Sequence, residues 1–233
     1  ESGSGKSISS LALLGLLPST LSIKGQVWLG QQDVLTLKSE QLRQIRGQKM
    51  AMIFQEPMTA LNPLHRVEKI IGETLLLQGW SKAKTQARII ELLNDVGMTD
   101  PEDKLRRYPH EMSGGQRQRV MIAMALALDP DILIADEPTT ALDVTLQAQI
   151  LALLKSLQQS RKMAMILISH DLNLVHRYAD QVIVMNKGLV AEQGSVDEIF
   201  KHPKQVYTQD LLNHDFGQAI AIADRPDILT LHN

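Results

Sequence analysis

Two short apolar segments, Asp131–Ala135 and Met163–Ile168, constrain the fold more than any other feature of this sequence. The first lies between Pro130 and a pair of acidic residues, and both are typical of buried strands. Amphipathic helical patterns precede, separate and follow them. Strands that alternate with helices predict an α/β fold, in which a mostly parallel sheet carries helices on its faces.

The same patterns divide the rest of the chain. The expected helices are Lys6–Leu17, Val67–Leu77, Lys82–Val96, Gln116–Leu128, Leu146–Leu157 and Leu172–Tyr178. The other expected strands are Gln26–Leu29, Lys49–Phe54 and Gln181–Met185. The polar stretch Asp224–Asp227 leads into a further strand-like stretch, Ile228–Leu231, which we interpret as the edge of another domain.

Composition excludes several classes of protein. The chain has no cysteine, which rules out disulfides, cysteine-held metals or clusters and a cysteine nucleophile within it. Its net charge of −2 argues against nucleic-acid binding by bulk charge. No apolar run approaches the ~18 residues of a membrane span, and the N-terminus has no signal-peptide pattern. We expect an intracellular chain that begins inside a longer protein, because no initiator methionine is present.

The N-terminal residues Ser2, Gly3, Ser4, Gly5, Lys6 and Ser7 match the end of the phosphate-binding motif G-x-x-x-x-G-K-[ST]. Glycines let backbone N–H groups approach phosphates, and the helix that follows adds its positive end. In this hypothesis Lys6 contacts the β- and γ-phosphates and the Ser7 hydroxyl binds Mg²⁺. A simple Ser/Gly turn is the alternative, although the apolar run after Ser7 disfavours it.

The apolar segment Ile132–Ala135 ends in two carboxylates, Asp136 and Glu137. Because ligands bind at the carboxyl ends of strands in such sheets, both acids are predicted to lie beside the Ser7 loop. Adjacent strand residues point to opposite sides, so two roles are possible. We expect Asp136 to hold Mg²⁺ and Glu137 to act as general base on water. A pair of solvated acids is the alternative.

Three further features lie at strand ends or helix starts. Residues Ser113, Gly114, Gly115 and Gln116 open a helix and predict a second anion site, with a plain helix cap as the alternative. His170 follows Met163–Ile168 and is a candidate to sense the γ-phosphate. Gln55 follows Lys49–Phe54 and is a candidate for contact with Mg²⁺ or water. Taken singly, a structural histidine and a loop glutamine are the better interpretations.

Taken together, these motifs resemble the ATP-binding subunit of an ABC transporter from Glu1 to about Leu212. The order is phosphate loop, Gln55 of the Q-loop, signature Ser113–Gln116, acidic strand, D-loop with Asp143, and switch His170. The resemblance implies a P-loop core, a helical subdomain at about residues 67–125, and largely missing N-terminal antiparallel strands. It also implies that two domains face each other head to tail and hold ATP and Mg²⁺ between the loop of one and the signature of the other.

The strings IFQEPMTALNPLH, ADEPTTALDVTLQAQIL and HPKQVYTQDLL resemble the dipeptide/oligopeptide/nickel importer branch. Within it, the similarity is greatest to microcin C and peptide importer ATPases, which fuse two ATPase domains in one chain. This implies one ABC ATPase domain at residues 1–223, then a linker and the possible first strand of a second domain at residues 224–233. Met112 departs from the usual leucine before the signature serine, and the first loop glycine and the adenine-stacking aromatic residue are absent.

The resemblance further implies ATP hydrolysis that powers import of peptides or peptide-like compounds. The expected partners are a second ABC ATPase domain, permease subunits that contact roughly residues 56–73, and indirectly a periplasmic solute-binding protein, without nucleic acid. The expected location is peripheral, at the cytoplasmic face of the inner membrane. Three alternatives remain: a non-transport ABC ATPase such as a translation factor, an importer of nickel or another small solute, and a degenerate site that binds ATP without hydrolysis.

Overall fold

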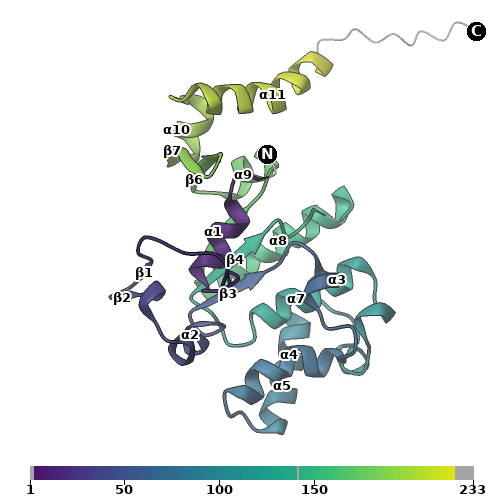
Figure 1. The fold of residues 1–233 in the computed structure, drawn as a ribbon. Helices are drawn as coiled ribbons and strands as arrows, with labels where there is room; N and C mark the ends of the chain where they lie inside the picture. Colours follow the sequence, from purple (N-terminus) through teal and green to yellow (C-terminus); the bar gives the residue numbers. More distant parts are fainter. Residues whose placement is uncertain (1–2, 141, 224–233) are drawn as a thin grey trace, which may run out of the picture. The chain divides into compact units, whose positions relative to one another are not determined.

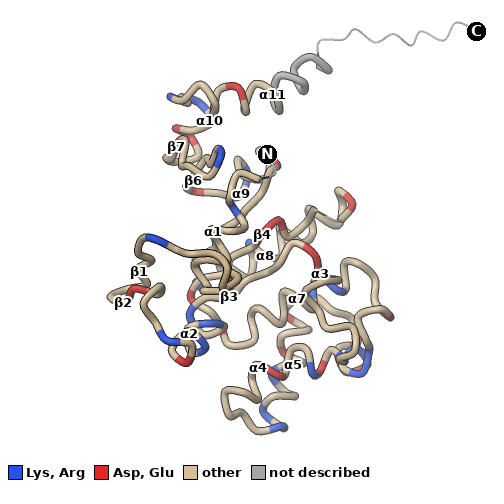
Figure 2. Tube along the Cα trace, in the orientation of Figure 1, with Lys and Arg blue, Asp and Glu red and all other residues tan. Residues whose placement is uncertain are grey.

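The structure is a computed structural model that describes residues 3–140 and 142–223, with side chains as far as residue 214. The chain divides into two compact units, each described by itself below. The larger unit is Ser7–Ile168. The smaller unit combines Glu1–Lys6 with Ser169–Asn233. Acidic and basic residues are interspersed along the trace (Figure 2), in keeping with the near-neutral net charge.

The larger unit is built on a three-stranded parallel sheet in the order β3-β4-β5. The strands are β3 (Met50–Ile53), β4 (Ile132–Asp136) and β5 (Ala164–Ile168). Alternate residues of β4 enter different cores: Leu133 and Ala135 pack in one apolar cluster, and Ile134 packs in the other. The central strand is therefore buried on both faces, which explains its uninterrupted apolar sequence.

Helices cover the two faces of this sheet (Figure 1). The larger cluster joins the sheet to α4 (Val67–Leu77), α5 (Lys82–Asp95), α7 (Gly114–Ala125) and α8 (Val144–Arg161). The smaller cluster joins it to α1 (Lys6–Leu13) and α2 (Ser39–Ile45). The remaining elements are short: β1 (Trp28–Leu29), β2 (Gln32–Asp33), η1 (Val34–Thr36), α3 (Pro57–Ala60), α6 (Pro101–Lys104) and η2 (Pro109–Glu111).

The smaller unit contains an antiparallel hairpin of β6 (Gln181–Asn186) and β7 (Leu189–Ser195). Lys187 and Gly188 form its turn with φ of 47° and 79°, the left-handed conformation that two-residue hairpin turns require. The hairpin packs with α9 (Leu172–Tyr178), α10 (Val196–Lys201) and α11 (Val206–Ala223). None of the helices in the described ranges is long and apolar enough to cross a membrane.

Most expected elements are present, with three corrections. The first helix ends at Leu13 rather than Leu17, because Gly15 adopts φ 61° and the Leu16 N–H bonds to the Leu11 carbonyl in a Schellman-type end. The helix expected at Leu146–Leu157 extends from Val144 to Arg161, since Asp143 caps its start. The strand expected at Gln181–Met185 extends to Asn186 and pairs antiparallel with β7, a partner that the sequence did not predict.

Other differences are smaller. The helix expected at Gln116–Leu128 begins at Gly114 and ends at Ala125. Elements α2, β2, β7, α10 and α11 were not expected from the sequence. The expected strand Ile228–Leu231 lies outside the described residues.

Candidate functional site

A hydrogen bond brings the phosphate-loop motif to the acidic strand. The Ser7 hydroxyl, at the start of α1, donates to Oδ1 of Asp136 at 3.1 Å. Asp136 is the last residue of β4 and is only 5% exposed. The two residues are 129 positions apart in the sequence. Their predicted contact at the carboxyl edge of the sheet is confirmed by this hydrogen bond.

The glycines of the loop have the conformation that the motif requires. Gly3 and Gly5 adopt φ of 88° and 92°, a region that residues with a Cβ rarely occupy. Within the smaller unit, the Gly188 N–H donates to the Ser4 carbonyl at 3.2 Å. The Lys6 ammonium donates to Oγ of Ser4 at 2.9 Å. The loop is thus tightly bent, as a phosphate cradle must be, while Ser2 lies outside the described residues.

Glu137 immediately follows β4, and its carboxylate accepts hydrogen bonds from Gln55 and Thr140. Nε2 of Gln55 donates to Oε2 at 3.0 Å, and the Thr140 hydroxyl donates to the same oxygen at 2.9 Å. The backbone of Glu137 has φ 45°, and its N–H donates to the Ile168 carbonyl at the end of β5. This left-handed turn, rather than the alternation of a continuing strand, sets Glu137 apart from Asp136.

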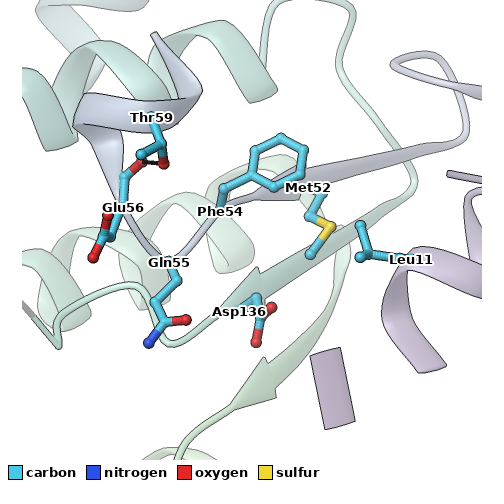
Figure 3. A pocket seen from close by; sticks show the side chains of 7 residues that line it. All are labelled: Leu11, Met52, Phe54, Gln55, Glu56, Thr59 and Asp136. Carbon is cyan, nitrogen blue, oxygen red and sulfur yellow. Dashed lines mark hydrogen bonds between the residues drawn. The ribbon is translucent and has the colours of Figure 1, made fainter. Parts of the chain in front are cut away.

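Gln55 and Asp136 also line a pocket of about 270 Å³ at this edge of the sheet. Figure 3 shows both side chains there, with Leu11, Met52 and Phe54 forming the apolar part of the lining and Glu56 and Thr59 completing it. The Gln55 and Asp136 side chains therefore lie in one open, partly apolar hollow at this edge.

The oxygen-bearing side chains at this edge fit a magnesium ion. Mg²⁺ prefers carboxylate, hydroxyl and amide oxygens, and Ser7, Asp136 and Gln55 supply one of each. The Ser7–Asp136 bond already places two of these groups within hydrogen-bond distance. This donor set, all of it within the larger unit, is suited to a metal ion that accompanies a phosphate group.

The signature residues begin α7 and form a capping box. Oγ of Ser113 accepts from the Gln116 N–H, and the Gln116 side chain accepts from the Ser113 N–H. A Cβ on Gly115 would lie 2.8 Å from a methyl carbon of Leu146 in α8, so a larger residue here would displace the Leu146 side chain. Asp143, expected in the D-loop, caps α8 by accepting from the Leu146 N–H, and Ala141 lies outside the described residues.

His170 belongs to the smaller unit, between Ser169 and Asp171. The Ser169 hydroxyl accepts from the Asp171 N–H, and the Asp171 carboxylate caps α9. The imidazole is exposed. Its predicted contact with a γ-phosphate stays a prediction, as does that of Lys6, which the same unit contains.

Two residues near Glu137 were missed from the sequence. Thr140 carries a hydroxyl three residues after the carboxylate, a spacing that could have indicated its local bond. Gln118 lies inside α7, is 1% exposed and donates from Nε2 to the Pro138 carbonyl at 2.7 Å. A glutamine within a helical pattern does not reveal in the sequence that its partner is a carbonyl twenty residues away.

Comparison with known proteins identifies the family. The family described as "ABC transporter" matches residues 1–140, more than half of the chain. This chain belongs to the ABC transporter family. The Ser7–Asp136 hydrogen bond and the helix α7 both lie within the matched residues.

The curated relatives of this ABC transporter chain are named as transport ATP-binding proteins. The peptidoglycan transport ATP-binding protein YejF of Agrobacterium fabrum is 53% identical over 215 residues, which cover 91% of this chain and 39% of that protein. The dipeptide transport ATP-binding proteins DppD of Haemophilus influenzae and Escherichia coli are 52% and 51% identical over the same share of this chain and 65% of theirs. The chain therefore spans between two fifths and two thirds of these relatives.

Solved ABC cassettes have the same fold. A dimeric post-hydrolysis state of the ATP-binding cassette MJ0796, bound to ADP and Pi, has a TM-score of 0.72 at 28% identity, with 84% of this chain and 82% of that chain covered. CbiO1 of Clostridium perfringens, part of the CbiONQ transporter complex, has a TM-score of 0.75 at 26% identity, with 97% and 85% covered. The α/β fold with a P-loop core is confirmed.

Proposed function

We propose that this chain hydrolyses ATP to power the import of peptides or peptide-like compounds across the inner membrane. The observation that carries the chemistry is the pairing of Ser7 with Asp136 beside the Gln55–Glu137 contact. The cargo class is supported by relatives whose names specify dipeptide or peptidoglycan transport. Those transport names do not favour a translation factor or a nickel importer.

The roles of the residues follow from their chemistry. Backbone N–H groups of Gly3 to Lys6 and the Lys6 ammonium bind the phosphates, with Ser2 at the edge of the loop. Ser7, Asp136 and Gln55 hold Mg²⁺. The bound ion supplies positive charge that stabilises the transferred phosphoryl group. The protein contributes mainly position and electrostatics, as in other phosphoryl transfers.

Glu137 acts as the general base in this proposal. Water attacks the γ-phosphorus, and its proton passes to the Glu137 carboxylate. The bond between the γ-phosphorus and the β–γ bridging oxygen breaks, so the products are ADP and phosphate. His170 faces the γ-phosphate as the switch that distinguishes ATP from ADP. Gln55 would leave Glu137 and would offer its amide to the metal or to the attacking water.

The complete site requires a second domain. Ser113, Gly114, Gly115 and Gln116 of one ABC domain cover the ATP held by Lys6 of the other, and Asp143 lies at the same interface. YejF is more than twice as long as its matched segment, which leaves room for a second ATPase domain in the same chain. Residues 1–223 form one such domain in this proposal, and residues 224–233 a linker to the next.

Closure of two domains on ATP and opening after hydrolysis drive the permease subunits. The helical subdomain, about residues 67–125, and the segment after Gln55 form the surface that receives them. A periplasmic solute-binding protein delivers the cargo from the other side. The chain then works peripherally, at the cytoplasmic face of the membrane.

The decisive experiment replaces Glu137 with glutamine in the complete natural protein, assembled with its permease subunits in proteoliposomes. We expect ATP turnover to fall by about a hundredfold or more, because general-base catalysis contributes roughly 10²–10⁴. Uptake of a labelled dipeptide should fall in parallel. Glu40→Gln, an exposed glutamate of α2, is the matched control. Wild-type turnover in Glu137→Gln would refute the base assignment.

A further inference from the structure

We infer that the Thr140 hydroxyl is a positioning residue that holds the carboxylate of Glu137 for catalysis. The inference rests on the proposed function, since it concerns the geometry of the proposed base. Its starting observation is the 2.9 Å bond from Oγ1 of Thr140 to Oε2 of Glu137.

Glu137 needs such support because of its backbone. With φ 45°, it has left the sheet, so its side chain does not continue the alternation of β4. Its N–H is anchored on the Ile168 carbonyl, and its carbonyl accepts from the Thr140 N–H at 3.3 Å, which closes a tight turn. The side chain beyond this turn has several rotatable bonds, and a general base must be held within a narrow range of positions.

Two donors on Oε2 restrict that side chain, and they differ in origin. The Gln55 amide comes from the segment after β3, 82 residues earlier in the chain. The Thr140 hydroxyl comes from the same turn as Glu137, three residues later. A partner within one turn moves together with the carboxylate, whereas the bond to Gln55 breaks whenever the two segments separate.

This difference assigns distinct tasks to the two donors. In the proposed cycle Gln55 would turn to the attacking water, so it would not hold Glu137 at the moment of proton transfer. Thr140 keeps its bond throughout, and this bond fixes the direction of the carboxylate that receives the proton. A hydrogen bond to a charged acceptor is stronger than one between neutral groups, which suits this task even at an exposed position.

Thr140→Val removes the hydroxyl and preserves the branched shape, and Thr140→Ser keeps the hydroxyl. In the assembled transporter, we expect Thr140→Val to lower kcat about tenfold, as loss of one hydrogen bond to a charged group does. The KM for ATP should stay within about twofold, because Thr140 is not placed on the nucleotide. Thr140→Ser should restore kcat to within about threefold of wild type.

Thr36→Val is the matched control. Thr36 is also exposed and donates to a carbonyl three residues earlier, that of Asp33, at 2.8 Å. It lies in η1 and is not among the residues placed in the site. Its substitution should leave kcat unchanged, which separates loss of a local hydroxyl bond from loss of the bond to Glu137.

A double-mutant cycle with Glu137→Gln distinguishes positioning from a structural role. If Thr140 acts through the carboxylate, Thr140→Val has no further effect on the residual turnover of Glu137→Gln. An equal loss of kcat in both backgrounds, or unchanged kcat in Thr140→Val alone, overturns the inference. Failure of the proposed function is separate: it appears as wild-type turnover in Glu137→Gln itself.

Discussion

The amide of Gln118 in α7 donates to the carbonyl oxygen of Pro138 at 2.7 Å, inside the protein. Pro138 directly follows Glu137, and α7 begins with the signature residues. A single buried hydrogen bond therefore connects the signature helix to the turn that carries the proposed base.

Loss of this bond should lower stability. We expect Gln118→Leu to reduce the free energy of unfolding by about 1–3 kcal/mol, because the Pro138 carbonyl would remain buried without its donor. Urea unfolding followed by circular dichroism measures this. Gln149→Leu is the matched control, since Gln149 is an exposed glutamine of α8. Equal stability of wild type and Gln118→Leu would contradict the importance of the bond.

The Ser7–Asp136 pair predicts a change in magnesium dependence. Asp136→Asn should raise the Mg²⁺ concentration for half-maximal ATPase activity about tenfold or more, because a neutral amide binds the hard cation less well. Titration of activity with Mg²⁺ at saturating ATP measures it. Asp131→Asn is the control, as Asp131 lies near the other end of β4 in an exposed ion pair with Lys49. An unchanged titration for Asp136→Asn would exclude it as a ligand.

Packing between α7 and α8 predicts the effect of a single methyl group. Gly115→Ala would place a Cβ 2.8 Å from one Leu146 methyl carbon and 2.9 Å from the other. Overpacking costs about 1–3 kcal/mol, more than the ~1 kcal/mol by which alanine favours a helix over glycine. We expect a lower unfolding midpoint for Gly115→Ala than for wild type. The double variant Gly115→Ala/Leu146→Ala should have a higher midpoint than Leu146→Ala alone, because the leucine methyl groups that crowd the new Cβ are gone. Additive losses would show that the two positions do not interact.

The cap of α10 predicts a pH-dependent contribution to stability. The Ser195 N–H and hydroxyl, both donating to Oε2 of Glu198 at 2.9 Å, hold the pKa of this carboxyl below its usual range. A lowered pKa in the folded state stabilises the protein above the ordinary glutamate pKa, and this contribution is lost as the pH falls through the folded-state value. The difference in Tm between wild type and Glu198→Gln should therefore be present at pH 7 and shrink below about pH 4. A difference independent of pH would rule out the carboxylate as its source.

Sequence periodicity predicts the elements whose apolar pattern is regular. The bounds of α4 and α9 coincide with the expected Val67–Leu77 and Leu172–Tyr178. Strand β7 was missed because Leu189 and Val190 are both exposed, which gives neither an alternating nor a continuous apolar pattern. The early end of α1 depends on Gly15, whose left-handed conformation appears only when the chain reverses there.

The site shows the same division. The sequence was enough to predict that one edge of the sheet carries Ser7, Gln55, Asp136 and Glu137, because strand ends and helix starts share that edge in a parallel sheet. The contacts of Thr140 and Gln118 could not be predicted, since they depend on the left-handed turn after β4 and on the seating of α7. His170 and Lys6 belong to the smaller unit, and their part in the site stays a prediction.

The positive φ of Glu137 has a consequence for engineering. A glutamate in this backbone conformation carries roughly 1 kcal/mol of strain that glycine or asparagine would relieve. A screen of random variants for heat resistance would therefore enrich replacements at this position that have lost turnover. The natural glutamate lowers thermal stability and supplies the proposed general base. Selection for thermal stability alone would therefore remove it.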